Sequence, residues 1–156
     1  FPLFVGNYIL GGGGFVSRLM KMIRSEHGKT YGIRSDFESY IQEGIFSISV
    51  ATRNSETLET IDLALSALAK LRDEGVTAEE LLAAKRSMVG SYPLSIETDF
   101  AVGQRIVSAK LFGLGLDRVT NFRVQVAGVP RAAVNNAAKT YLHPESLSHS
   151  MYCCMN

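Results

Sequence analysis

The sequence predicts an α+β fold in which several helices pack on one face of an antiparallel sheet. Two strand-like segments follow one another at 30–38 and 45–52, and the second alternates polar and apolar residues as a half-buried strand does. Helical patterns with recognisable start and stop signals fill most of the remaining chain. With 156 residues, 46% of them hydrophobic and 20% charged, the chain can bury a core, and we expect residues 1–156 to form a single domain.

The N-terminal segment predicts two helices separated by glycines. Residues 1–10 are apolar at helical spacing, and the run Gly11, Gly12, Gly13, Gly14 interrupts that pattern. Residues 15–27 then predict an amphipathic helix, for which Gly28 provides the stop. The expected buried face of this second helix consists of Phe15, Leu19, Met22 and Ile23.

A hairpin is expected to join the two strands, with its linker at 40–44. Ser55 is a candidate cap for the next helix, which ends at Gly75 and has an expected buried stripe of Leu58, Ile61, Leu65 and Leu68. Thr77 and Glu80 then have the spacing of a capping box, in which side chains and exposed amides satisfy one another.

The C-terminal half predicts further helices. Pro93 ends the helix that begins after Thr77, and two more are expected at 99–112 and 116–126. Pro130 fits the first turn of another helix, which runs to Tyr141. Residues 146–155 predict a weak final strand. The adjacent Cys153 and Cys154 are expected to be inert thiols, because a bridge between neighbours is strained.

Composition and charge exclude several classes of function. A net charge of +1 gives no electrostatic reason to bind nucleic acid or an anionic membrane. No apolar run is long enough to cross a bilayer, and the composition is typical of a soluble globular protein whose compartment the sequence does not reveal. The chain begins at Phe1 within an apolar pattern, so we expect a fragment or a processed product.

Two kinds of ligand site are also disfavoured. The only histidines are His27, His143 and His149, and they do not have the spacing of a catalytic zinc site, which needs three protein ligands and an open position. We therefore expect no metal ligands in this chain. The glycine run is not followed by the Lys-Ser/Thr pair of a phosphate-binding loop, so nucleotide binding is not expected.

The order of several motifs resembles the second, non-zinc domain of the pitrilysin/insulinase family of zinc metallopeptidases, whose zinc domain carries an inverted H-x-x-E-H motif. The resemblance covers roughly residues 3–145. It rests on residues 7–10 before the glycines, on residues 17–19 after them, and on the segment from Arg24 to Tyr31. Familial segments further along are 71–77, 85–86 and 91–94.

This resemblance implies a division of labour. Family members pair homologous domains around a closed chamber that admits unfolded peptides, and one domain carries the zinc and the glutamate base. The other contributes an arginine and a tyrosine near the scissile bond, which correspond here to Arg24 and Tyr31 in the spacing R-x-x-x-x-x-x-Y. The resemblance also suggests that Gly11–Gly14 border the peptide chamber, and that zinc belongs to a partner domain or subunit.

Two alternatives remain open from the residues alone. Arg24 can be a solvated helix residue and Tyr31 a packed strand aromatic, with the glycines forming only a turn between packed helices. The whole chain can also be a proteolytically silent homologue that serves as a structural or assembly subunit. The family fold further implies a strand and a helix before Phe1, so we expect an exposed sheet edge and self-association.

Overall fold

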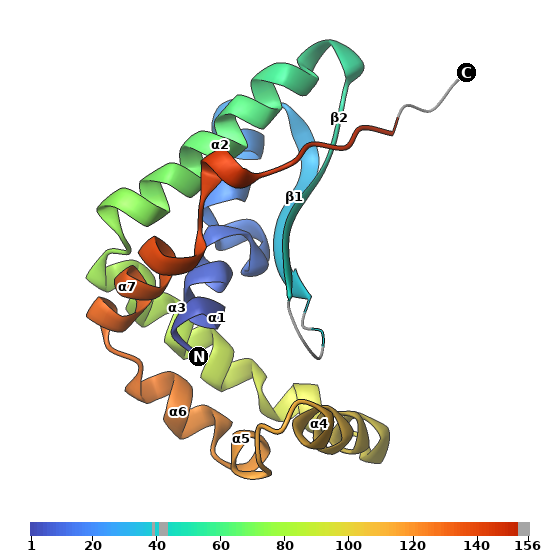
Figure 1. The fold of residues 1–156 in the computed structure, drawn as a ribbon, viewed down its shortest axis with the longest axis vertical. Helices are drawn as coiled ribbons and strands as arrows, with labels where there is room; N and C mark the ends of the chain where they lie inside the picture. The colour runs from blue at the N-terminus through green and yellow to red at the C-terminus, as the bar shows by residue number, and fades with distance from the viewer. Residues whose placement is uncertain (39, 41–43, 153–156) are drawn as a thin grey trace.

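The protein is described by a computed structural model covering residues 1–38, 40 and 44–152, and it confirms the α+β class (Figure 1). Strands β1 (Thr30–Glu38) and β2 (Ile45–Thr52) pair in antiparallel fashion, with Ile33 opposite Val50 and Glu38 opposite Ile45. The predicted hairpin is thereby confirmed, although linker residues 41–43 lie outside the described residues.

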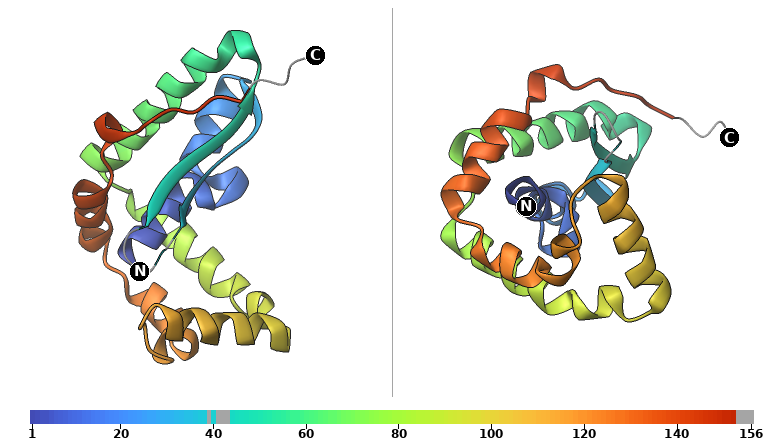
Figure 2. Two further views of the ribbon diagram at one scale, coloured as in Figure 1. Left: turned by 45° about the vertical axis from the view of Figure 1, so that its right-hand side comes forward. Right: turned by 60° about the horizontal axis from the view of Figure 1, so that its bottom comes forward.

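The N-terminal segment lies in the middle of the molecule. Helix α1 (Pro2–Asn7) continues directly into a π-helical stretch, η1 (Tyr8–Gly12), and both lie inside a ring formed by the sheet and the other helices (Figure 2). They contact β1, α2 (Thr57–Glu74), α3 (Ala78–Ser91) and α7 (Arg131–Tyr141). The hydrophobic core forms around this segment; its largest fully buried side chains include Leu10, Leu19, Ile23, Leu68, Leu71 and Leu142.

The prediction that the first helix ends at Leu10 was wrong by two residues. Gly11 and Gly12 remain helical in η1, whose wider turn is closed by the Gly13 N–H donating to the Tyr8 carbonyl over 2.8 Å. The expected helix over 15–27 is also shorter. A separate 3-10 turn, η2 (Gly14–Val16), precedes the π-helical η3 (Met20–Glu26), so Phe15 is 70% exposed instead of buried.

Only part of the predicted buried face of helix α2 is buried, since Leu68 is buried as expected but Ile61 and Leu65 are half-buried. Leu58 is exposed, and the buried residues are Thr60, Ala64, Ala67, Leu68 and Leu71. Small side chains on this face allow the helix to approach its neighbours closely. The prediction of a Ser55 cap was also wrong, because Ser55 falls inside the 3-10 turn η4 (Asn54–Glu56), and α2 starts after Glu56 without a side-chain cap.

Helix α3 begins with the predicted capping box. The Glu80 N–H donates to Thr77 Oγ1 over 3.1 Å, and the Thr77 N–H donates to Glu80 Oε2 over 2.8 Å. The Glu80 carboxylate also accepts hydrogen bonds from Nε and Nη2 of Arg18, each over 2.7 Å. Hydrogen bonding to Arg18, followed by that to the Thr77 backbone, lowers the pKa of Glu80. One carboxylate therefore stabilises the start of α3 and fixes it to the segment that follows the glycine run.

The C-terminal half contains more breaks than the sequence predicted. Helix α4 (Asp99–Leu111) agrees with the prediction and follows a 3-10 turn, η5 (Pro93–Ile96). The expected helix over 116–126 is two short ones, α5 (Asp117–Thr120) and α6 (Phe122–Gly128), and Pro130 caps α7 from outside its first turn. After η6 (Pro144–Ser146), residues 147–152 form no strand, which contradicts the predicted final strand; Cys153 and Cys154 lie outside the described residues.

Across the described part of the chain, no helix is both long and apolar enough to cross a membrane.

The Glu80 junction yields a stability prediction. Glu80→Gln keeps the shape of the side chain but removes the charge that Arg18 contacts, so we expect a loss of about 1.5 kcal/mol in the free energy of unfolding at pH 7. The native pKa of Glu80 lies below its ordinary value of 4.5. The stabilisation by the charged Glu80 carboxylate is therefore fully present above pH 4.5 and is lost as the pH falls through the native pKa.

Urea unfolding from pH 7 to pH 3 measures this effect, and the difference between wild type and variant should close at the acidic end. Glu79→Gln is the matched control, because Glu79 lies in the same first turn and is exposed. An equal loss in both variants would contradict the role of the Arg18 contact.

Candidate functional site

Arg24 lies in the last turn of η3, next to the buried Ile23. Its guanidinium carbon lies 4.8 Å from the centre of the exposed Phe15 ring, within the range of a cation–π contact. The helix ends as predicted at Gly28, which has φ +62°. There the Gly28 N–H donates to the Arg24 carbonyl, and the Lys29 N–H donates to the Ile23 carbonyl. The backbone that carries Arg24 is thus fixed, while its side chain remains half-buried at the surface.

Tyr31 is the extra residue of a β-bulge. Thr30 pairs with Thr52 and Gly32 with Ala51, which leaves Tyr31 without a partner in the register. Thr30 Oγ1 accepts the Gly32 N–H over 3.0 Å and donates to the Ala51 carbonyl, and these bonds stabilise the bulge. The Tyr31 side chain is 95% exposed. Bulges commonly redirect a side chain next to active sites, and the side chain at this one is exposed to solvent.

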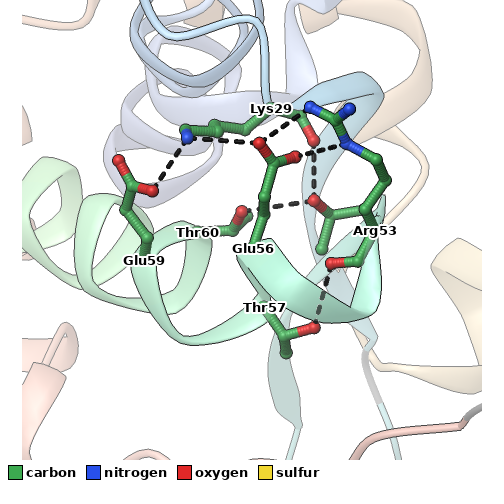
Figure 3. A network of polar contacts seen from close by, with 7 residues as sticks. Lys29, Arg53, Glu56, Thr57, Glu59 and Thr60 are labelled. Carbon is green, nitrogen blue, oxygen red and sulfur yellow. Dashed lines mark hydrogen bonds and ion pairs between the residues drawn. The ribbon is translucent and has the colours of Figure 1, made fainter.

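A polar network at the start of α2 fixes the chain between Arg24 and Tyr31 (Figure 3). Lys29 Nζ lies 2.8 Å from Glu59 Oε2 and 3.2 Å from Glu56 Oε1. Glu56 also accepts two hydrogen bonds from Arg53, from Nε over 2.9 Å and from Nη2 over 2.8 Å. Thr52 Oγ1 donates to the Lys29 carbonyl over 2.6 Å. The residue before the bulge is therefore held by both its side chain and its backbone.

The charges in this network support one another. Hydrogen bonding to Arg53, and to a smaller extent to Lys29, lowers the pKa of Glu56. Hydrogen bonding to Glu59 and then to Glu56 raises the pKa of Lys29. Both groups are therefore ionised at neutral pH, where the network remains intact. No sequence signal identified it, since Lys29 precedes β1, whereas its partners come from the end of β2, η4 and α2.

The four glycines, predicted as a substrate-binding loop, have different surroundings. Gly11 is buried, and a Cβ there would lie 2.5 Å from the Ser35 backbone nitrogen and 2.8 Å from Leu19 Cδ1. Gly14 has φ +62°, and nothing lies within 4 Å of the position of its Cβ. Gly11 thus serves the packing of η1 against β1. Gly12 and Gly14 are exposed and remain available to a ligand, and Gly13 is half-buried.

The described residues of this chain do not fit a zinc site. Within residues 1–38, 40 and 44–152, no three His, Cys, Asp or Glu side chains lie together in a way that could hold a metal ion. His27 follows η3 as its exposed C-terminal cap, and His143 Nδ1 lies 3.4 Å from Glu145 Oε1.

Comparison with known proteins identifies the family. A family model described as the peptidase M16 inactive domain matches residues 1–88, more than half of the chain. The chain belongs to this family. The matched part of this M16 inactive domain includes the glycine run, Arg24, Tyr31 and the hairpin. The resemblance to the non-zinc domain of the pitrilysin family is thereby confirmed.

Similar proteins support this assignment. This M16 inactive domain is 33% identical over 98 residues to an uncharacterized zinc protease, YmxG, of Bacillus subtilis, covering 63% of this chain and 24% of that protein. It is 34% identical over 91 residues to a non-peptidase homolog, YmxG, of Helicobacter pylori, covering 56% of this chain and 20% of that protein. The chain thus spans about a quarter or less of the length of these two relatives.

A solved structure of the peptidase M16 inactive domain from Pseudomonas fluorescens superimposes with a TM-score of 0.84 and 30% identity, covering 92% of this chain and 34% of that one. The similarity extends well beyond residues 1–88, so the fold of the C-terminal helices is also that of the family.

Proposed function

We propose that this chain, residues 1–156, is the non-zinc domain of a pitrilysin-like metallopeptidase. In this role Arg24 and Tyr31 donate hydrogen bonds to the carbonyl oxygen of the scissile peptide bond, on which negative charge develops in the transition state. A zinc-bearing homologous domain or subunit supplies the metal and the activated water. The exposed glycines, Gly12 and Gly14, line the path of the peptide substrate.

The observation that carries this proposal is the bulge at Tyr31. A large aromatic side chain that is 95% exposed gains nothing for folding, and the bulge leaves it without a partner in the sheet, so its phenol is accessible to a substrate. Strand β1 contacts η3, so the elements that carry the two donors are adjacent. Arg24 also lies in a π-helical stretch, a conformation found frequently at functional sites.

The two side chains suit this chemistry. A guanidinium keeps its charge at every physiological pH and offers several donors, and a phenol adds one more. Phe15 orients the Arg24 guanidinium without neutralising it, because a cation–π contact leaves its N–H groups free for other partners. Both donors can therefore meet an anionic oxygen with little rearrangement.

The division of labour predicts that the isolated chain is inactive. After dialysis we expect no stoichiometric zinc and no cleavage of a fluorogenic peptide, because the described residues supply no ligand set. Mixing with a zinc-bearing partner should produce chelator-sensitive cleavage. Metal analysis and the peptide assay test both statements. One zinc per isolated chain, together with turnover, would show that the metal site lies here after all.

A second candidate function is a structural or assembly subunit without proteolytic activity. The relative from Helicobacter pylori, named a non-peptidase homolog, favours it. The presence of both Arg24 and Tyr31 favours the peptidase, since a purely structural subunit needs neither. The reading frames next to the gene distinguish the two functions: an H-x-x-E-H motif there supports the peptidase, and its absence supports the silent subunit.

A further inference from the structure

A second candidate binding site lies at the end of the molecule formed by α4, α5 and α6. A cavity of about 600 Å³ opens there between these helices, η5 and α1, a size typical of ligand sites. Figures 1 and 2 show this group of helices at the opposite end from the start of α2. Neither Arg24 nor Tyr31 lines the cavity.

The cavity combines an apolar wall with two arginines. Phe4, Leu114 and Phe122 provide apolar surface, and Arg105 and Arg118 provide two positive charges. No Asp or Glu lines the cavity, and among the described residues neither arginine forms an ion pair with a carboxylate. Two uncompensated guanidinium groups beside an apolar surface are complementary to an anion that also carries apolar groups.

Aromatic rings hold both arginines in place. The Arg105 guanidinium carbon lies 5.0 Å from the centre of the Tyr92 ring, and its Nη2 donates to Ser95 Oγ over 2.9 Å. The Tyr92 ring stacks on Phe122 with 4.3 Å between centres, and its hydroxyl donates to a backbone carbonyl over 2.6 Å. Arg118 lies 4.4 Å from the centre of the Phe1 ring. Guanidinium groups oriented before binding lose less conformational entropy when a ligand arrives.

From this arrangement we infer that the cavity binds a peptide segment in which acidic side chains stand next to large apolar ones. The carboxylates contact Arg105 and Arg118, and the apolar side chains pack on Phe122 and Leu114. A small inorganic anion uses only half of this surface. Phe4, Leu114 and Leu116 are each about half exposed at 47%, 46% and 49%, so apolar surface continues beyond the charged groups as a longer ligand requires.

The test uses two fluorescent peptides, both acetylated and amidated so that no terminal charge contributes. One has the sequence Glu-Leu-Glu-Phe and the other Gln-Leu-Gln-Phe. Fluorescence anisotropy should show the acidic peptide binding about tenfold more tightly at low salt, and the difference should shrink as salt screens the charges. Arg105→Gln and Arg118→Gln should each lower the affinity for the acidic peptide about tenfold.

The matched control is Arg123→Gln, because Arg123 is exposed on α6 but does not line the cavity. It should leave the affinity unchanged. Methyl NMR of the wild-type chain adds a second measurement that needs no variant: the acidic peptide should shift the signals of Leu114 and Val119, which line the cavity. If a Gln variant fails to fold, the affinity of Arg105→Lys for the acidic peptide replaces it, and this affinity and the NMR shifts together test the inference.

The inference would be overturned by equal binding of the two peptides, by an Arg123→Gln defect as large as that of Arg105→Gln, or by the absence of binding at millimolar peptide. Displacement of the acidic peptide by inorganic phosphate at an equal concentration would also overturn it, because the site would then recognise a small anion and make no use of its apolar wall.

Discussion

Tyr31→Phe should lower kcat on the order of a hundredfold in the complex of this chain with its zinc-bearing partner, with little change in KM. The variant keeps the ring and removes only the hydroxyl, and a donor that acts on transition-state charge typically contributes roughly 3 kcal/mol to lowering the barrier. Folding should be unaffected, because the Tyr31 side chain is 95% exposed. Steady-state kinetics and thermal unfolding measure the two effects separately.

Tyr152→Phe is the matched control for this experiment. Tyr152 is also 95% exposed, but it lies in the C-terminal tail, far in sequence from the Arg24 and Tyr31 pair that the family resemblance implies. We expect wild-type kinetics from it. If Tyr31→Phe is equally active while the zinc site is occupied, Tyr31 has no catalytic role, and the function as a silent subunit gains support.

Gly11→Ala should destabilise the fold by about 3 kcal/mol, the upper range for forcing an extra carbon into a packed site. The new methyl group would meet the backbone nitrogen of Ser35, which cannot move without moving β1. It would also disturb a buried pair of hydrogen bonds, in which Asn7 Nδ2 donates to the Ser35 carbonyl over 3.0 Å and Ser35 Oγ donates to Asn7 Oδ1 over 2.6 Å. Denaturant unfolding measures the loss.

Gly90→Ala and Gly103→Ala are the controls for this prediction. Both glycines lie in helices, α3 and α4, and have open space where a Cβ would be. Alanine should stabilise each helix by roughly 0.5–1 kcal/mol because it restricts the unfolded chain. A Gly11→Ala variant as stable as these two would show that η1 does not pack closely on β1.

Sequence patterns predicted the regular elements well where local rules decide the structure. The alternation at 45–52, the capping box at Thr77 and the glycine stop at Gly28 each depend on residues within one turn or one strand, and all three are present. The predictions failed where packing overrides local preference. Leu58 satisfies a helical stripe but is exposed, because the small Thr60 and Ala64 define the face that approaches the core.

The candidate site was predictable only in part, for a similar reason. The spacing of Arg24 and Tyr31 is a local signal, and the family resemblance indicates that it marks a site. The contacts that hold Lys29 join residues up to 30 positions apart, and the arginines of the cavity meet their aromatic partners through folding alone. No spacing in the sequence indicates such encounters, since they depend on how α2, α4 and the hairpin are placed in space.

The bulge at Tyr31 has a consequence for how such domains diverge. Because Tyr31 has no partner in the sheet and its side chain faces solvent, the strand places no demand on which residue occupies that position. Under the proposed function, a substitution there changes the chemistry offered to a substrate while the pairing of β1 with β2 stays the same. Activity would then be lost or regained by single mutations under no selection from folding, so that active and silent descendants share one architecture.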